Sequence, residues 1–355
     1  MARRRDKKSS DVFFKIILII CAVMLCISYI SIFIDPAKLW IPMFFGLYYI
    51  PIFALNVLLL IIAVFRRKKS MLIPLIALVP SLFFADLFVK FGREEKVYQS
   101  DGIKVLTYNV GRFSAGVRGE SADKTAAHIV DFIGDENADI VCLQEFCIKD
   151  TALIFNYFHQ YPYHAQYYFK GENYCGNLTL SKYPILASGV IKFDKSTNLC
   201  IWSNMRTTDG IARVYNCHLE SYSLSFTSMV KRLSKKGNFT DEFMGIHSKL
   251  KGTTQKRSAQ VATLLNDVEE CQYPSIICGD FNDTPISYAY HRIKSGAKDS
   301  FVEGGEGFSS TYSVLWPLLR IDYILLPDKY SADKHRITRI PFSDHYPVST
   351  LIFFE

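Results

Sequence analysis

The chain carries Gly279-Asp280-Phe281-Asn282 directly after the apolar run 274–278, and Ser343-Asp344-His345 shortly before the apolar run 348–353. Both strings therefore lie where a short buried strand is expected to end or begin. Polar side chains at the edges of buried strands are typical of catalytic sites, because a rigid scaffold holds them in place. The two strings predict a catalytic rim rather than a solvated loop.

The same arrangement recurs through the rest of the C-terminal region. Strand-like runs are expected at 103–108, 139–143, 177–181, 214–218 and 321–326, and helices at 123–136, 256–269 and 287–294. Asn109, Glu145 and His218 lie at the ends of three of these runs. Many strands with a few long helices predict a mixed, layered fold.

Composition divides the 355-residue chain near residue 100. Residues 1–100 contain 14 Lys and Arg against 6 Asp and Glu, which gives this part a net charge of +8. The net charge of the whole chain is +7. The remaining residues therefore have a net charge of −1. This balance does not favour a nucleic-acid groove in the C-terminal region.

Three apolar runs in the first part, at about 12–34, 39–65 and 71–89, each meet the length of roughly 20 residues that a bilayer requires. We therefore expect a membrane anchor at 1–95 and a catalytic domain at 96–355. Asp86, near the end of the third run, marks either a transport path or, more simply, an interfacial carboxylate.

Basic residues flank the expected spans unevenly. Five precede the first span, four separate the second from the third, and only Lys38 lies between the first two. Basic loops stay in the cytoplasm, so we expect a cytoplasmic N-terminus and an extracytoplasmic catalytic domain.

Nine cysteines form no zinc-like spacing, and Cys142, Cys217 and Cys278 are expected as buried free thiols.

Cleavage of a phosphate ester by water requires a cation, a base for the water, donors for the phosphoryl oxygens and an acid for the leaving oxygen. Glu145, Asp344 and the amide of Asn109 offer the oxygen ligands that Mg²⁺ or Mn²⁺ prefers. The sequence therefore predicts a magnesium or manganese site and no zinc site.

The remaining polar residues supply the proton chemistry. His345 is expected to accept a proton from water or to stabilise charge, with Asp322 fixing its ring. Asp280 would align the water or share the metal, and Asn282 would donate to phosphoryl oxygens. His218 would be a charged donor or the leaving-group acid. Each signal alone has a simpler structural interpretation, but together, in this order, they favour catalysis.

These residues lie in an ordered series of motifs that spans residues 101–355. The motifs are Leu106-Thr107-Tyr108-Asn109, Leu143-Gln144-Glu145, Gly176-Asn177-Leu178-Thr179-Leu180-Ser181, Tyr215-Asn216-Cys217-His218-Leu219, Gly279-Asp280-Phe281-Asn282, Arg320-Ile321-Asp322-Tyr323-Ile324 and Ser343-Asp344-His345. The series resembles the endonuclease/exonuclease/phosphatase superfamily, which has the deoxyribonuclease I-like fold.

The resemblance implies an α+β, four-layer α/β/β/α sandwich with a divalent-metal phosphoesterase site at one edge. It matches Asn109, Glu145 and Asp344 to the metal positions, the pair His345 and Asp322 to the catalytic dyad, and Asp280 and Asn282 to the phosphate site. His218 matches a histidine of deoxyribonuclease-like and sphingomyelinase-like members. Asn177 is either a phosphate-side donor or a strand-end residue that satisfies the backbone.

The leading hypothesis is a membrane-embedded phosphoesterase that acts on a lipid head group, a small phosphoester or a nucleic acid, with no protein partner implied. The alternatives are an extracytoplasmic nuclease acting on DNA or RNA, a catalytically silent binding protein of the same fold, and a transporter. The basic segment 221–255 is expected to be an irregular insertion, either a solvated loop or a phosphate-steering or membrane-surface patch.

Overall fold

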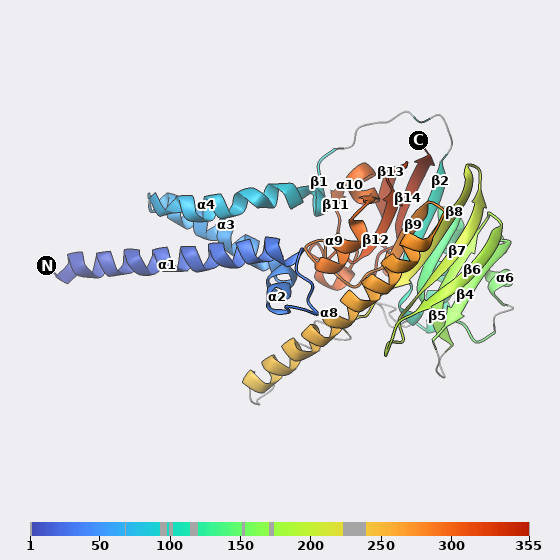
Figure 1. The fold of residues 1–355 in the computed structure, drawn as a ribbon, viewed down its shortest axis with the longest axis horizontal. Coiled ribbons are helices and arrows are strands. Elements are labelled where there is room, and N and C mark those ends of the chain that lie inside the picture. The colour runs from blue at the N-terminus through green and yellow to red at the C-terminus, as the bar shows by residue number, and fades with distance from the viewer. Residues whose placement is uncertain are drawn as a thin grey trace.

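The computed structural model describes residues 2–67, 69–92, 98, 102–113, 120–150, 153–169, 174–222 and 239–354. Apolar helices at the start of the chain extend away from a body built of two stacked β-sheets (Figure 1). Both residues of the expected boundary at 95/96 and residues 223–238 of the basic segment lie outside the described residues.

Two of the N-terminal helices are long and apolar enough to cross a membrane, Ser10–Ser31 and Lys69–Leu87. The first belongs to α1 (Ala2–Ser31), and the second combines η1 (Lys69–Met71), α4 (Leu72–Leu78) and η2 (Val79–Leu87). Between them, α2 (Ile41–Leu47) and α3 (Tyr49–Phe65) form a third span only if the two are counted as one, because they meet at a bend of 69°. The three-span count therefore stays a prediction.

The bend has a local cause in the sequence. Pro51 has no backbone N–H, and its ring clashes with the carbonyl four residues earlier, that of Leu47. Leu47 is the last residue of α2, and Pro51 lies in the first turn of α3, where a missing N–H is tolerated. A continuous apolar run is thus divided into two helices.

The described residues of the body form two six-stranded sheets. Sheet I has the order β13-β14-β2-β3-β5-β4 and sheet II the order β10-β12-β9-β8-β7-β6. Sheet I comprises β2 (Ile103–Asn109), β3 (Ile140–Cys147), β4 (Tyr163–Tyr168), β5 (Cys175–Ser181), β13 (Tyr330–Ile337) and β14 (Val348–Phe354). Sheet II comprises β6 (Ile185–Lys192), β7 (Leu199–Thr207), β8 (Gly210–His218), β9 (Ser275–Asp280), β10 (Ala297–Asp299) and β12 (Asp322–Pro327). A small ribbon pairs β1 (Val89–Lys90) with β11 (Gly307–Phe308).

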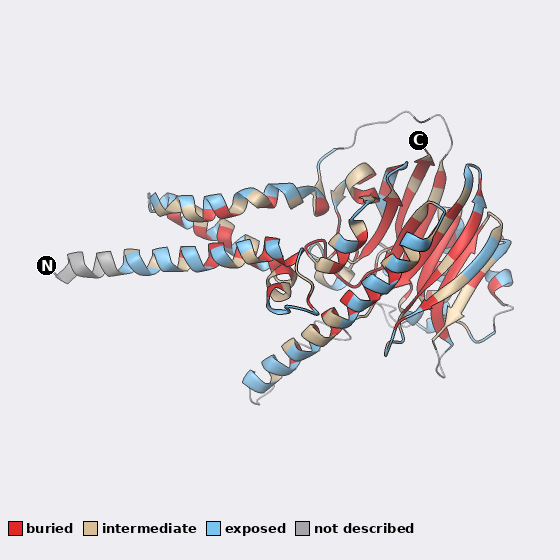
Figure 2. Cartoon of the chain, viewed as in Figure 1, coloured by how far each residue is buried: buried red, intermediate tan, exposed pale blue. Residues whose placement is uncertain are grey.

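Alternating side chains of the central strands form two kinds of core. Val105 and Cys142 of sheet I meet Val214 and Cys278 of sheet II in the core between the sheets. The next residues along the same strands point outward and are covered by helices. Figure 2 shows the resulting band of buried residues across both sheets.

The outer faces are covered by one helical layer each. On sheet I, α5 (Ala122–Glu136) packs over β2 and β3; on sheet II, α8 (Phe239–Glu270) and α9 (Tyr288–Lys294) pack over β8 and β9. Short elements complete the body: η3 (Gly111–Phe113), α6 (Leu153–Tyr157), α10 (Ser300–Gly304) and η4 (Ser313–Leu315). This arrangement confirms the predicted four-layer α/β/β/α sandwich.

One expectation about local structure is wrong. Residues 239–255, expected to be irregular, form the first half of α8, which is 32 residues long. Gly245, Gly252 and neighbouring threonines lower the helix propensity of this stretch, so the sequence pattern alone does not indicate a helix. Packing against the N-terminal helices stabilises it instead, as tertiary contacts commonly do.

The cysteines behave largely as expected. Cys142, Cys217 and Cys278 are buried free thiols. Cys147 and Cys175 form a disulfide that joins the end of β3 to the start of β5.

Candidate active site

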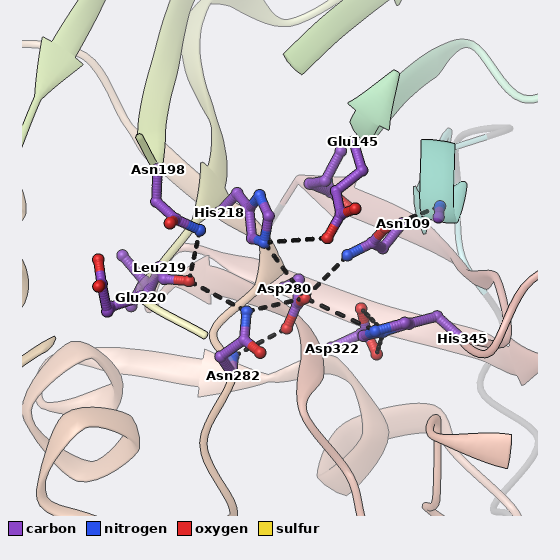
Figure 3. A network of polar contacts seen from close by, with 12 residues as sticks. Asn109, Glu145, Asn198, His218, Leu219, Glu220, Asp280, Asn282, Asp322 and His345 are labelled. Carbon is purple, nitrogen blue, oxygen red and sulfur yellow. Dashed lines mark hydrogen bonds and ion pairs between the residues drawn. The ribbon is translucent and has the colours of Figure 1, made fainter. Parts of the chain in front are cut away.

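Strand ends from both sheets meet at one edge of the sandwich. In sheet I, β2 and β3 run parallel, which places Asn109 beside Gln144 and next to Glu145. In sheet II, β8 and β9 run parallel, so His218 lies beside Asp280, and β12 begins with Asp322 opposite Asp280. The strand order thus gathers residues that are far apart in the sequence (Figure 3).

Asp280 is at the centre of this cluster. Its Oδ2 accepts hydrogen bonds of 3.0 Å from Asn109 Nδ2 and Asn282 Nδ2, and its Oδ1 accepts one of 2.8 Å from the Asn282 backbone N–H. His218 Nε2 lies 3.7 Å and His345 Nε2 3.8 Å from Oδ2. Burial raises the pKa of Asp280 to about 6, although the positive charges of His345 and His218 oppose this shift.

His345 is held by Asp322. Its Nδ1 lies 3.0 Å from Asp322 Oδ2, and its backbone N–H donates to Ser343 Oγ. Burial lowers the pKa of His345, but Asp322 and then Asp280 outweigh that effect and raise it to about 10. The backbone N–H of Asp322 donates to Thr311 Oγ1 at 3.1 Å, which fixes the start of β12.

Glu145 has an unusual backbone conformation. Its φ is +52°, and the β3–β5 register shifts between Leu143 and Phe146, so the strand bulges at this residue. Regular alternation would place Glu145 on the outer, helix-covered face with Val141 and Leu143, and the bulge redirects its side chain. Arg112 Nε lies 3.1 Å from Glu145 Oε2, and His218 Nε2 lies 3.8 Å from Oε1. Burial raises the pKa of Glu145, but the charges of His218 and Arg112 outweigh it and lower the pKa.

His218 is buried, and neither of its ring nitrogens has a hydrogen-bond partner among the described residues. Its Nε2 lies between the carboxylates of Glu145 and Asp280 at ion-pair distances. An unpaired buried imidazole is costly, so its presence at this edge indicates a place for a ligand.

Asn282 shapes the loop that follows Asp280. Its φ of +53° is a left-handed conformation that asparagine tolerates well. Its Nδ2 donates to the carbonyl of Leu219 and to Asp280, both at 3.0 Å. Donation to a phosphoryl oxygen, as predicted from the sequence, therefore requires Asn282 to exchange one of these partners.

Two other predicted residues lie less centrally. Asn177 Nδ2 donates to the Asn216 carbonyl at 3.0 Å and the Leu199 carbonyl at 3.3 Å, which favours its strand-end role between the sheets. Ser343 Oγ donates to the Asp344 carboxylate at 3.4 Å. Asp344 as a metal ligand and Asn177 as a phosphate ligand stay predictions.

The side chains at this edge fit a hard divalent cation. Carboxylate and amide oxygens of Asn109, Glu145 and Asp280 are the donors that Mg²⁺ and Mn²⁺ prefer, and the orphaned His218 nitrogens face the same region. Asp280, Asp322 and His345 also have donor atoms within 4.8 Å of one another. Because Asp322 and His345 already bond to each other, the rim formed by Asn109 and Glu145 fits a cation better.

Several residues at the site have only weak sequence signals. Tyr312 stacks edge-on against His345 with ring centroids 5.3 Å apart, and burial with nearby Asp344 and Asp280 raises its pKa to about 12. Arg257 of α8 donates to the Glu220 carbonyl and pairs with Asp283 at 2.8 Å, which ties the loops after β8 and β9 together. No catalytic motif surrounds Tyr312 in the sequence, so only the fold brings it to the site.

Comparisons with known proteins agree with this geometry. A model of the Endonuclease/Exonuclease/phosphatase family matches residues 106–345, and a model of a domain of unknown function matches residues 11–87. A comparison with curated protein sequences finds no match.

Solved structures share the fold of the C-terminal region. An endonuclease/exonuclease/phosphatase from Bacteroides vulgatus is 16% identical, with 72% of this chain and 100% of that chain covered and a TM-score of 0.55. One from Beutenbergia cavernae is 16% identical, covers 71% of each chain and has a TM-score of 0.54. The human Nocturnin catalytic domain is 18% identical, covers 73% of this chain and 97% of its own, and has a TM-score of 0.53. The family match and the clustered site together show that this chain belongs to the endonuclease/exonuclease/phosphatase family of phosphoester hydrolases.

Proposed function

We propose that the protein is a membrane-anchored, divalent-metal-dependent phosphodiesterase that cleaves its substrate by direct attack of water. One observation carries the proposal. Imidazoles and amides from both sheets meet around the buried carboxylate of Asp280, at hydrogen-bond or ion-pair distances. Burying so many polar groups is unfavourable unless a charged ligand uses them.

Asn109 and Glu145, with Asp344, would hold Mg²⁺ or Mn²⁺. When bound, the cation would neutralise charge on the phosphoryl oxygens. The bulge at Glu145 supports this role, because it turns the carboxylate toward His218 and Asp280. Arg112, more than half exposed, is paired with Glu145 and lies at the outer rim, where a substrate phosphate would approach.

The pKa values of two neighbouring residues suit different tasks. With a pKa of about 6, Asp280 is ionised at neutral pH and can orient the attacking water and accept its proton. With a pKa of about 10, His345 is an imidazolium at neutral pH and stabilises negative charge on the phosphoryl group. His218, whose ring nitrogens make no hydrogen bond among the described residues, would donate to the substrate or to the leaving oxygen.

The proposed organisation is an anchor at 1–95 and a catalytic domain at 96–355, with the N-terminus in the cytoplasm and the domain outside it. The uneven basic residues around the apolar helices support this orientation. The disulfide between Cys147 and Cys175 is a second argument, because such bonds persist mainly in oxidising compartments.

The charge of the C-terminal region favours a lipid head group or a small phosphoester over a nucleic acid. Binding to a duplex relies on many Lys and Arg contacts with phosphate, and the net charge of residues 101–355 is −1. The apolar N-terminal helices also favour a substrate at a membrane.

The test is hydrolysis by the full chain in lipid nanodiscs, using a soluble aryl phosphodiester with and without Mg²⁺ or Mn²⁺. We expect activity only with added cation, and its loss in His345→Ala. His159→Ala, which changes an exposed histidine of the α6–β4 region, is the matched control and should keep full activity. Activity that resists chelation, or that survives in His345→Ala, would refute the assignment. Parallel assays with DNA, RNA and phospholipids then identify the substrate class.

A further inference from the structure

Helix α8 extends well beyond the sheet that it covers. Val261 and Leu264, in its C-terminal half, pack into the core over sheet II. Its N-terminal half projects past the body on the side where the apolar helices leave it (Figure 1). Figure 2 shows mostly exposed and intermediate residues along this projecting half. The proposed catalysis requires the C-terminal half of α8, because this half carries Arg257. It does not explain why the N-terminal half of α8 extends beyond the body.

The projecting half contacts one specific part of the anchor. His247 Nε2 lies 3.1 Å from the Tyr48 hydroxyl, and its ring lies 5.0 Å from that of Phe44. Lys251 Nζ lies 4.5 Å from the Trp40 ring centre. Further along α8, Ser258 Oγ donates to Asp35 Oδ1 at 2.6 Å. These contacts hold α8 against the connection between α1 and α3, at the end of the apolar helices nearest the catalytic body.

Large apolar side chains remain exposed at this contact. Met244 is 56% exposed and Phe243 is 44% exposed, and the Phe243 ring lies 3.9 Å from that of His247. On the anchor, Trp40 is 37% exposed and stacks edge-on against Phe44. We call the exposed set the junction face, which comprises Leu39, Trp40, Ile41, Phe243 and Met244.

The position of the junction face identifies what covers it. Trp and other aromatic residues concentrate where a bilayer meets water, and the junction face lies at one end of the apolar helices. Lys249 and Lys251 follow Met244 within about two turns of α8, and basic residues of this kind are common in helices that lie in the plane of a membrane. A bilayer crossed by α1 would reach Trp40 and, beside it, the first turns of α8.

We propose that the junction face is a lipid-binding surface through which the N-terminal half of α8 rests on the leaflet nearest the catalytic domain. The inference rests on the proposed membrane anchor. The contact with lipid would also affect the position of the active site, because α8 continues from this surface to Arg257, which holds the loops after β8 and β9. The bilayer surface and the catalytic edge are thus joined by one rigid helix.

The test uses the full chain in nanodiscs of phosphatidylcholine, with or without bromine atoms along the whole length of the acyl chains, which quench nearby tryptophan. Three variants each add one tryptophan: Met244→Trp in the junction face, Ala262→Trp at an exposed position of the C-terminal half of α8, and Ile20→Trp on the exposed side of α1. We expect the added emission of Met244→Trp and Ile20→Trp to be largely lost in brominated lipid, and that of Ala262→Trp to persist.

The outcomes separate the two proposals. If Ile20→Trp is quenched and Met244→Trp is not, the lipid-binding surface is refuted while the anchor stands. If Ile20→Trp is not quenched, the anchor is refuted and the inference falls with it. Hydrolysis of the soluble phosphodiester by the same samples reports catalysis independently, because none of the three positions belongs to the active site.

Discussion

The substitution Asp322→Asn tests the electrostatic core of the site. It keeps the shape of the side chain and leaves the backbone hydrogen bond to Thr311 in place. It removes the largest of the charges that raise the pKa of His345 from 6.5 to about 10. That rise corresponds to roughly 5 kcal/mol in favour of the imidazolium, at about 1.4 kcal/mol per pKa unit.

We expect the variant to lower the pKa of His345 by about one to three units, the usual effect of losing an adjacent opposite charge. The new amide has one acceptor oxygen instead of two and can also donate, so it fixes the ring and its tautomer less firmly, and the turnover number should fall by about 10²- to 10⁴-fold. Because the imidazolium is the active form in our proposal, the alkaline limb of the pH–rate profile should move to lower pH.

The assay is the pH dependence of phosphodiester hydrolysis at saturating Mg²⁺, for the wild type and for Asp322→Asn. Asp267→Asn is the matched control, because Asp267 accepts hydrogen bonds from Arg213 and Tyr215 on the outer face of sheet II, away from the site. Unchanged turnover and an unchanged alkaline limb in a folded Asp322→Asn protein would refute the role given to the pair.

Other perturbations probe the metal, the disulfide and a second buried histidine. Glu145→Gln should raise the Mg²⁺ concentration for half-maximal activity by at least about tenfold, measured by metal titration, and an unchanged titration would place the cation elsewhere. Replacing Cys147 and Cys175 with serine should lower the free energy of unfolding by about 2–4 kcal/mol in denaturant titrations, and equal stability would contradict a role for the disulfide. Burial lowers the pKa of His335 to about 3, whereas it titrates near 6.5 when unfolded, so the stability present above pH 6.5 should be lost as the pH falls toward 3, by up to about 5 kcal/mol. His335→Gln should flatten that pH dependence of unfolding, and a profile identical to the wild type would assign it to other groups.

The sequence predicted the layered fold because its strands are short apolar runs that end on polar residues. Asn109 and His218 close such runs, and the parallel pairs β2–β3 and β8–β9 bring their ends to one edge. Helix α5 was predicted almost to the residue. In the structure Ser121 caps its first turn, and Asn137 ends it in a left-handed conformation. Features that depend on neighbouring residues in the chain, such as strand ends and helix caps, can be predicted from one sequence.

Features that depend on contacts between distant segments were not predictable. The first half of α8 is helical because it packs on α2. Residues 239–255 show no periodic pattern from which this packing could be predicted. The bulge that gives Glu145 a φ of +52° depends on the register between β3 and β5. The disulfide between Cys147 and Cys175 joins the same two strands, and seven cysteines outside the first helix allow many pairings.

The geometry around Asp280 also explains how one small site handles both proton and charge chemistry. Asp280 is buried, so its carboxylate remains basic enough to accept a proton near neutral pH. His345, 3.8 Å away, keeps its proton because Asp322 lies on the far side of its ring. If the two environments were exchanged, the carboxylate would be too weak a base to take a proton from water. The imidazole beside it would be neutral and could not offset charge on the phosphoryl group. The separation of the two pKa values is therefore a property of burial and partner placement.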